Sequence, residues 1–471
     1  MLTGFLVSKS HPRERGSALI IALILMAVLS ALAASLVFVT QIEVSSASTY
    51  RQTTQARYVA ESGAQAAVDW LKNNLPAPDT TKLDLTKYPA TLKNGTCSSS
   101  DTSGCVVLSA GLGSGTYSSV DSTAAASFSN FFNSSSNGNQ ITDMPGGNYN
   151  VQAQMMNVKV FKLLGGGTSL VHSWKITSQG NVSGIHNAQA QVSLTVENFP
   201  SPIFSYGAFG NSSACSAISM GSLAGTDSYD SSQGPWNAST NHSDTQGNVG
   251  SNGSVSLLGA VIHGNDAYAN VGGTCSAPSG PNAGNVIQIS QLSLPSVPTP
   301  TGLGAAVPCG GTCSTLTPGT HYGNIALSGT QLLTLGSGTY YLDGLSVSNQ
   351  AQIHVSPPGS AIVMYILGSS GPVIAGNGIS NIGTGDAPVN FQILYGGGGS
   401  SSIVGNGTAQ VVFYAPNSDV IVTGSAGLMG ALYGNTVSIN GASTLHYDRQ
   451  IANSLNISGP MMATAFSWDR Y

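Results

Sequence analysis

The chain has 471 residues, and charged residues make up 7% of them, against about a quarter in a typical soluble domain. With 14 Lys and Arg and a formal net charge of −5, it has no basic surface for phosphates, so we expect no nucleic-acid partner. Its 59 glycines accompany short apolar bursts at regular intervals, which favours a β-rich secreted protein over a disordered chain.

The chain begins with a short basic leader that is followed by a long apolar run. Residues 17–40 contain no charge and, at about 1.5 Å per residue, are long enough to cross a hydrocarbon core of about 30 Å. Lys9, Arg13 and other basic leader residues are expected to stay in the cytoplasm. The expected processing point lies between Gly16 and Ser17, so cleavage leaves the apolar helix on the mature protein. The alternative is a plain signal anchor that is never cleaved.

The helical pattern continues beyond the apolar run as far as Leu75. Apolar and small residues recur there at three- and four-residue steps, which is typical of one buried helix face. Asn73, Asn74 and Pro76 are expected to end the helix. Small side chains in this stripe allow close packing against a sheet, and they are Ala56, Ala60, Gly63, Ala64 and Ala67.

After the helix, residues 76–147 are expected to form a polar connection without a strong structural pattern. Three runs with period-two alternation follow at 149–163, 170–178 and 188–196, separated by glycine-rich turns. Such runs predict antiparallel strands joined by hairpins. A Pro-Ser-Pro step at 200–202 predicts a domain boundary.

The remaining β-rich region consists of short apolar strands divided by Gly and Asn, at intervals of about 15 to 25 residues. This texture predicts a right-handed β-solenoid, with an antiparallel β-sandwich as the alternative. The fold class is therefore expected to be α+β: a long helix with a small antiparallel sheet, then a large all-β domain. The predicted domains are a leader (1–16), a helix (17–75), a connection with a sheet (76–199), a solenoid-like domain (203–451) and a C-terminal tail (452–471).

Six cysteines fall in three local pairs: Cys97 with Cys105, Cys215 with Cys275, and Cys309 with Cys313. An even number outside the membrane predicts disulfides, although the sequence leaves their connectivity open. The spacing of the last pair also fits half of a metal site, but no second ligand pair accompanies it, so we predict no metal. Asp227 and Asp230 are expected to lie in a turn, with a Ca²⁺ site as the alternative.

Acid–base chemistry is sparse in the β-rich region. His446 lies two residues before Asp448, and β-solenoids include enzymes that act on polysaccharides with such groups. No Lys, Arg or Glu lies between residues 203 and 448, so no side-chain cation there can stabilise a developing anion. We therefore expect His446, Tyr447 and Asp448 to cap the last strand layer by hydrogen bonding, and we predict no catalytic residue and no cofactor.

Three stretches carry a family resemblance. The residues RERG at 13–16, directly before the apolar run, resemble the class III leader of type IV prepilins and pseudopilins. ARYVAESGAQAAVDWL at 56–71 resembles the end of the PilX N-terminal domain. GSAGLMGALYGNTVSINGASTLHYDRQI at 424–451 resembles a C-terminal domain found behind PilX-type N-termini in large bacterial surface pilins. The resemblance covers most of 15–75 and 203–451.

This resemblance implies cleavage by a prepilin peptidase between Gly16 and Ser17. The family usually carries Glu at the fifth mature position, where this chain has Ile21, and such all-apolar starts are found in PilX-type minor pilins and tip pseudopilins. The implied topology is a single pass through the inner membrane with a cytoplasmic N-terminus. Assembly would then carry the subunit into a pilus at the cell surface.

The resemblance further implies a non-enzymatic minor pilin or pseudopilin-like subunit, with other pilins and the inner-membrane pilus assembly machinery as partners. Ile21 and the bulky β-rich region together favour a tip or priming subunit that displays an adhesion domain to a cell-surface or glycan ligand. One alternative is a membrane-anchored surface enzyme with a β-helix fold that acts on polysaccharides. Another is a passive anchored envelope protein, in which the amphipathic helix is only a stalk.

Overall fold

The computed structural model describes residues 15–74, 107–112, 122–133, 146–184, 187–221, 223–279, 284–309, 313–375, 378–380, 387–405, 409–425 and 427–470. They form two compact units. The first contains residues up to Val158, His172–Glu197 and Met461–Tyr471, and the second contains Lys159–Val171 and Asn198–Pro460. The predicted leader up to residue 14 lies outside the described residues, as do Cys97 and Cys105.

A 60-residue helix, α1 (Arg15–Asn74), opens the chain, as predicted. Its first half exposes apolar side chains along its length, with Ile21 58% exposed. Among the described residues, α1 is the one helix long and apolar enough to cross a membrane. The second half buries one face, so a single helix changes from apolar all round to amphipathic along its length.

The buried face of α1 packs closely on a sheet, because small residues occupy both surfaces. Ala56 and Ala60 are fully buried. A Cβ added to Gly180 in the sheet would lie 2.2 Å from the Ala56 carbonyl oxygen and 2.4 Å from the Ala60 nitrogen. Gly63 on the helix approaches Ser178 and Tyr149 in the same way. The two glycines therefore set the distance between helix and sheet.

The sheet beneath α1 has five strands in the order β1-β2-β3-β4-β25. The three central strands confirm the predicted hairpin runs, and β3 pairs with β4 in antiparallel register from Ser173–Glu197 to Val182–Ala188. The strands are β1 (Val107–Ala110), β2 (Gly147–Lys162), β3 (Thr168–Val182), β4 (Ala188–Pro202) and β25 (Asn456–Arg470).

Two predictions about the flanks of this sheet were wrong. Residues 452–471 are not a tail, because β25 forms an edge of the sheet beside β4. Residues 76–147 are not only a connection, since they contain β1 and helix α2 (Ser122–Asn133). Phe128 and Phe132 of α2 are fully buried, and Phe128 meets Trp70 of α1 edge-on at 5.0 Å. Burial of this aromatic cluster stabilises a helix whose flanking sequence is polar.

The second unit is a large β-rich unit, and together with α1 it confirms the α+β class. Two sheets hold its short strands, one of 17 strands and one of three. The strands are β5 (Ala208–Gly210), β6 (Ile218–Met220), β7 (Gly225–Tyr229), β8 (Val249–Ser251), β9 (Val255–Leu257), β10 (Val261–Ile262), β11 (Asn265–Tyr268), β12 (Asn285–Gln288), β13 (His321–Leu327), β14 (Leu332–Leu335), β15 (Gly338–Val347), β16 (Gln352–Val355), β17 (Ile362–Ile366), β18 (Val373–Ile374), β19 (Ile379–Ser380), β20 (Phe391–Tyr395), β21 (Ser401–Gly405), β22 (Ala409–Gly424), β23 (Gly427–Gly441) and β24 (Thr444–Asp448).

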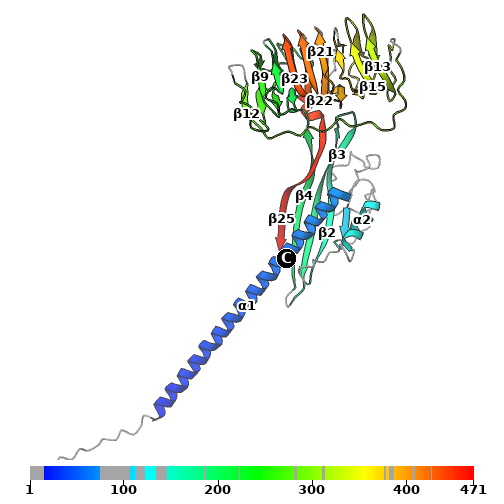
Figure 1. Ribbon diagram of the computed structural model, residues 1–471. Coiled ribbons are helices and arrows are strands. Elements are labelled where there is room, and N and C mark those ends of the chain that lie inside the picture. The colour runs from blue at the N-terminus through cyan, green and yellow to red at the C-terminus, as the bar shows by residue number, and fades with distance from the viewer. Residues whose placement is uncertain are drawn as a thin grey trace, which may run out of the picture. The chain divides into compact units, whose positions relative to one another are not determined.

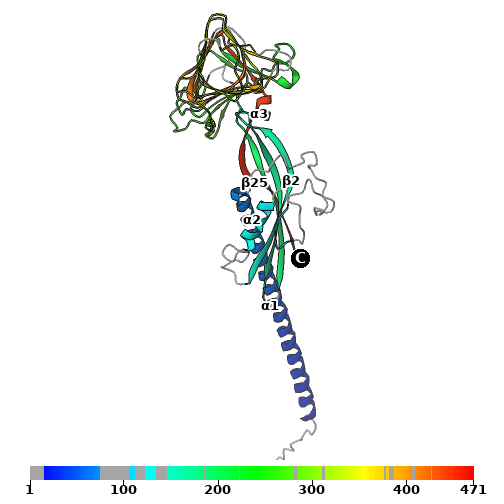
Figure 2. The ribbon, with the colours of Figure 1, turned by 90° about the vertical axis from the view of Figure 1, so that its right-hand side faces the viewer.

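The described strands of this unit pair in parallel register, so the antiparallel sandwich considered from the sequence is wrong. Seen from one end, they surround a common interior (Figure 2). The sequence separation between paired residues on neighbouring strands is irregular. Gly427 pairs with Thr444, whereas Ala208 pairs with Val249, which lies much farther along the chain. Long insertions between strands account for the uneven spacing of apolar bursts in the sequence.

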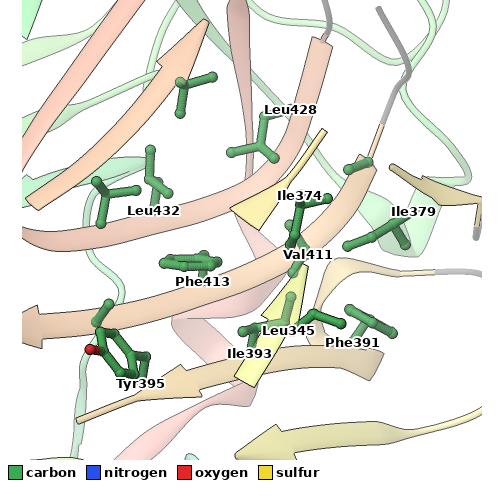
Figure 3. Packing of buried hydrophobic residues seen from close by; sticks show 14 of the residues in the cluster. Leu345, Ile374, Ile379, Phe391, Ile393, Tyr395, Val411, Phe413, Leu428 and Leu432 are labelled. Atoms are coloured by element: carbon green, nitrogen blue, oxygen red, sulfur yellow. The ribbon is translucent and has the colours of Figure 1, made fainter. Parts of the chain in front are cut away.

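Aliphatic and aromatic side chains from successive strands fill this interior. Figure 3 shows Phe391, Ile393, Val411, Phe413 and Leu432 pointing toward one another from β20, β22 and β23, and each is at most 1% exposed. Because alternate residues of a strand point to opposite faces, the inward positions are apolar and the outward ones vary. Burial of this cluster is the main source of stability in a unit with few charges.

The chain enters the parallel array near its middle (Figure 1). The first part of β23 pairs with β24, its middle with β5 and its last part with β6, so the first and last strands of the array in chain order both lie against β23. On the far side, β24 is followed by β7, and β5 by β8. The prediction that His446, Tyr447 and Asp448 cap the last layer was therefore wrong, because β7 covers β24.

An outer aromatic row runs across the same strands, on the face opposite the interior cluster. Its members are in register from strand to strand, with Leu394 between the second and third of them. Phe204, Ile451 and Leu455 pack on this row, the last two at helix α3 (Gln450–Ser454). The outer aromatic row consists of Tyr341, Tyr365, Tyr414, Tyr433 and Phe209.

We predict that Gly180→Ala destabilises the packing of α1 on the sheet by about 1–3 kcal/mol, because the added methyl group meets helix backbone that cannot move aside. Amide hydrogen exchange in peptides from β3, measured on the detergent-solubilised chain, should become faster. Gly167→Ala is the matched control, since its Cβ would meet only Leu163 at an ordinary 3.7 Å. Equal exchange in the two variants would contradict the close-packing account.

Candidate functional site

A group of polar side chains in the second unit lies where β24 meets β7. Asp227 of β7 and His446 of β24 are in register on neighbouring strands, both at positions that point away from the interior. His446 Nδ1 lies 2.6 Å from Asp227 Oδ1, and both residues are 6% exposed. The pair joins residues 219 positions apart in the chain. It therefore fastens the last strand of the array to the third.

The connection between β7 and β8 folds over this pair. Trp236 lies on the His446 ring, with ring centroids 4.0 Å apart. His242 Nε2 lies 3.4 Å from Asp227 Oδ2 and 3.0 Å from Asp244 Oδ1. Asp227 thus uses both oxygens, one toward each histidine. The indole and the second histidine screen the pair from solvent.

Asp448 anchors the neighbouring corner. Its Oδ1 accepts hydrogen bonds from the backbone N–H groups of Ser231 and Gln450, at 3.0 and 3.1 Å. Burial raises the pKa of the Asp448 carboxyl group, and these donors act against that rise. Burial also raises the pKa of Tyr229, with the Asp448 carboxylate adding to the shift. Asp448 and Tyr229 are therefore buried polar groups at this corner, and the connection between β7 and β8 has to cover them.

Asp230 has the turn role that the sequence suggested. It caps the short 3₁₀ helix Ser231–Gln233 by accepting from the backbone nitrogen of Ser232 at 2.9 Å. The side-chain hydrogen bond from Ser232 is the main cause that lowers its pKa. Asp227 instead lies within β7 and faces His446, so the turn expected for it was wrong. Within the described part of the chain, no group of three His, Cys, Asp or Glu side chains is placed to hold a metal ion.

These contacts connect the neighbouring strands β24 and β7, and we call the group formed by Asp227, His446, Trp236 and His242 the joint. The His446 ring is covered by Trp236 and held by Asp227, which leaves it little access to a substrate. The sequence suggested His446 with Asp448 and Asp227 with Asp230, whereas the structure pairs His446 with Asp227. Sequence reasoning missed Trp236 and His242, because isolated aromatic and imidazole residues in a polar segment give no periodic signal.

Asp266 is a second unusual carboxyl group, at one end of the array. It lies on β11 in register with Val249 and Val286, and Val249 belongs to the interior cluster. Asp266 is fully buried and neither of its carboxyl oxygens has a hydrogen-bond partner. Desolvation raises the pKa of Asp266 to about 7.

The structure joins Cys215 to Cys275 and Cys309 to Cys313 by disulfides, the pairings suggested by their order in the chain. The first closes a 60-residue separation and ties the connection before β6 to the one after β11. The second closes a short loop before β13, beside the interior cluster. Both reduce the freedom of segments between strands.

The residues predicted to form a packing stripe on α1 lie on its buried face: Ala56 and Ala60 at 0%, Ala64 at 1% and Ala67 at 0% exposure. A helix that is apolar in its first half and packs small residues on an antiparallel sheet in its second half defines a pilin-like N-terminal part. Residues 15–65 match the PilX N-terminal family model, so this segment is similar to the N-terminal part of that family.

Residues 306–454 match a second family model, described as a domain of unknown function (DUF7305). No curated protein matches the chain. Among solved structures, the competence-associated pilin ComZ from Thermus thermophilus is similar at 14% identity. That match covers 89% of this chain and 98% of the ComZ chain, with a TM-score of 0.35, which is too low for residue-by-residue transfer.

We predict that His446→Ala loosens the segment over the joint, because Asp227 loses its nearest partner and Trp236 its stacking surface. A buried group left without its partner costs about 1–3 kcal/mol. Hydrogen exchange in peptides from residues 230–246 should accelerate. His354→Ala is the matched control, since His354 occupies an outward position on β16, away from this joint. Equal protection of the segment in both variants would refute the joint.

We predict that Asp266 makes the second unit less stable as the pH rises. Because its pKa is higher in the folded chain (about 7) than in the unfolded chain (3.8), the folded state keeps the proton longer. Stability is therefore full below pH 4 and falls as the pH rises toward 7. Asp266→Asn should remove this dependence and gain on the order of a few kcal/mol relative to wild type between pH 4 and 8. Parallel stability–pH curves, measured by hydrogen exchange in β8 and β11, would contradict it.

Proposed function

We propose that the protein is a non-enzymatic minor subunit of a type IV pilus system, placed at the tip or in the priming complex. The observation that carries the proposal is the position of the second unit in the chain. It is inserted between β4 and β25, two neighbouring strands of the pilin-like sheet. A shaft subunit is repeated in close packing, and an insertion of this size at every repeat opposes such packing.

Ile21 supports the same placement. After cleavage between Gly16 and Ser17, the fifth residue is an isoleucine, 58% exposed on α1, where pilins usually carry glutamate. Without that carboxylate the subunit lacks the usual partner for a neighbouring N-terminal amine. Addition of many copies in a shaft is then disfavoured, whereas a single copy at an end is tolerated.

The second unit would be the displayed domain. We infer that it is a right-handed β-solenoid, a fold supported by parallel pairing from β13 through β23 and onward to β12. Its outward surface carries few charges, which suits adhesion to a cell-surface or glycan ligand. The subunit would first span the inner membrane once with a cytoplasmic N-terminus, be cut by a prepilin peptidase, and then join other pilins through the assembly machinery.

We predict that the pilus-associated form begins at Ser17 and occurs at pilus ends. Immunogold labelling of the second unit on sheared pili tests its position, and N-terminal sequencing of the same material tests processing. Gly16→Val should block cleavage and remove the protein from pili, while leaving its level in the membrane fraction similar. Ala18→Val, a change beyond the junction, is the matched control. Even labelling along the shaft, or an uncleaved N-terminus in pili, would overturn the proposal.

A further inference from the structure

One histidine holds the end of the long connection between β12 and β13. His321 is the first residue of β13, and each nitrogen of its ring lies within hydrogen-bond distance of an oxygen. Nδ1 lies 3.0 Å from the Gly304 carbonyl oxygen, and Nε2 lies 2.8 Å from Asp343 Oδ1 on β15. These three residues, which we call the clasp, therefore join the connection to two neighbouring strands.

The connection that the clasp holds, residues 289–307, packs on the outer aromatic row. Near its start, the Leu292 N–H donates to Asn252 Oδ1, and the Leu292 carbonyl oxygen accepts from Asn252 Nδ2, both at 2.9 Å. Farther along, the Pro295 carbonyl oxygen accepts from the hydroxyl group of Tyr414 on β22. The connection thus crosses the strands from the end of β8, past β22, to β13.

Two backbone hydrogen bonds lie beside the clasp. The Val307 N–H donates to the His321 carbonyl oxygen at 2.8 Å, and the Gly323 N–H donates to the Val307 carbonyl oxygen at 3.0 Å. The Val307 side chain is 45% exposed, so its burial contributes little to holding this end of the connection. The clasp adds side-chain hydrogen bonds to these two backbone bonds.

The protonation state of the His321 ring decides how many hydrogen bonds the clasp makes. A carbonyl oxygen and a carboxylate oxygen only accept, so each needs an N–H group from the ring. The imidazolium ring carries two N–H groups and satisfies both oxygens, whereas the neutral ring carries one and leaves one oxygen without a donor. The Gly304 carbonyl group and the Asp343 carboxylate accordingly raise the pKa of His321.

Asp343 is the charged group that faces the ring. The connection, residues 289–307, contains no titratable side chain. The other titratable groups on β13, β15 and β17 near the ring are tyrosines, and a phenol group ordinarily loses its proton only near pH 10. They are Tyr322, Tyr341 and Tyr365. The charge of this corner therefore changes near neutral pH through His321.

From this geometry we propose that the clasp is a pH-sensitive closure at the β13 end of the array. It is closed while the His321 ring carries two N–H groups, and it opens when the ring loses one of them. Opening frees the outer edge of β13, whose backbone groups are then available to another strand. The inference goes beyond the proposed pilus role and does not depend on it.

The direction of the pH dependence follows from the pKa of His321, which is higher in the folded chain than its ordinary value of 6.5. The folded state therefore keeps the second ring proton longer than the unfolded state does. The contribution of the clasp is full below about pH 6.5, and it is lost as the pH rises through the higher folded value.

The test measures amide hydrogen exchange of the full-length protein in detergent micelles at pH 6 and pH 8.5, corrected for the intrinsic pH dependence of exchange. Peptides that contain Val307 and Gly323 report the backbone bonds beside the clasp. We expect their protection to fall about two- to tenfold between the two pH values, the range for loss of one hydrogen bond. His321→Gln should remove this fall, because the glutamine side chain does not titrate.

His354→Gln is the matched control, since it makes the same change on β16, away from the clasp, and should keep the wild-type fall. Asp343→Asn should move the fall to lower pH, because the carboxylate that favours the charged ring is gone. Protection in wild type that does not change with pH, or an equal fall in His321→Gln, would overturn the inference.

A second measurement follows the His321 ring itself in wild type. The protein is labelled with ¹³C at the histidine rings, and the NMR signal of His321 is identified by its absence from His321→Gln. Its titration midpoint should lie above the midpoint of the histidines in the urea-unfolded chain. An equal or lower midpoint would refute the clasp. Neither measurement bears on pilus-end labelling, which tests the pilus role separately.

Discussion

The paths of several connecting segments in the second unit depend on its outer aromatic row, because buried phenol groups need both packing and hydrogen-bond partners. Three segments far apart in the chain supply those partners as backbone carbonyl groups. Tyr365 donates to Gly165 at the β2–β3 turn, and Tyr414 donates to Pro295 in the long connection after β12. Tyr447, packed beside the row, donates to Phe204 where the chain enters the array. These hydrogen bonds thus fix the paths of three segments: the β2–β3 turn, the connection after β12 and the entry to the array.

Local periodicity was enough to predict much of this fold. The three- and four-residue stripe ending near Leu75 predicted α1, and the period-two runs predicted β2, β3 and β4. Helix α2 and strand β25 were missed, since each is stabilised by contacts with distant elements and not by its own pattern. The order of the parallel strands was equally out of reach, because the pairing of β24 with β7 spans more than 200 residues.

For the candidate site too, single residues could be noticed in the sequence, but their contacts with distant residues could not be predicted. His446 and Asp227 were both noticed in the sequence, yet their partnership is a product of strand register. Asp266 gave no signal at all, since one aspartate in a polar, glycine-rich context resembles any turn residue. The residues with unusual environments are thus those whose neighbours come from other strands. Recognition of the N-terminal segment was easier, because its resemblance lies within one continuous helix, where the PilX family model matches.

The mid-array position of β5 and β24 has a mechanical consequence. Because the first and last strands both lie against β23, the strand array is tethered to the rest of the chain by two backbone connections, through residue 203 and through residue 455. A force that pulls on the array is therefore shared by two backbone connections. Either connection can be pulled away only by shearing β5 or β24 out of the sheet, and each of these strands is paired on both sides. The free ends of the array, at β12 and β13, carry no load. A force applied to the array through a bound ligand would therefore not separate strands from its free ends.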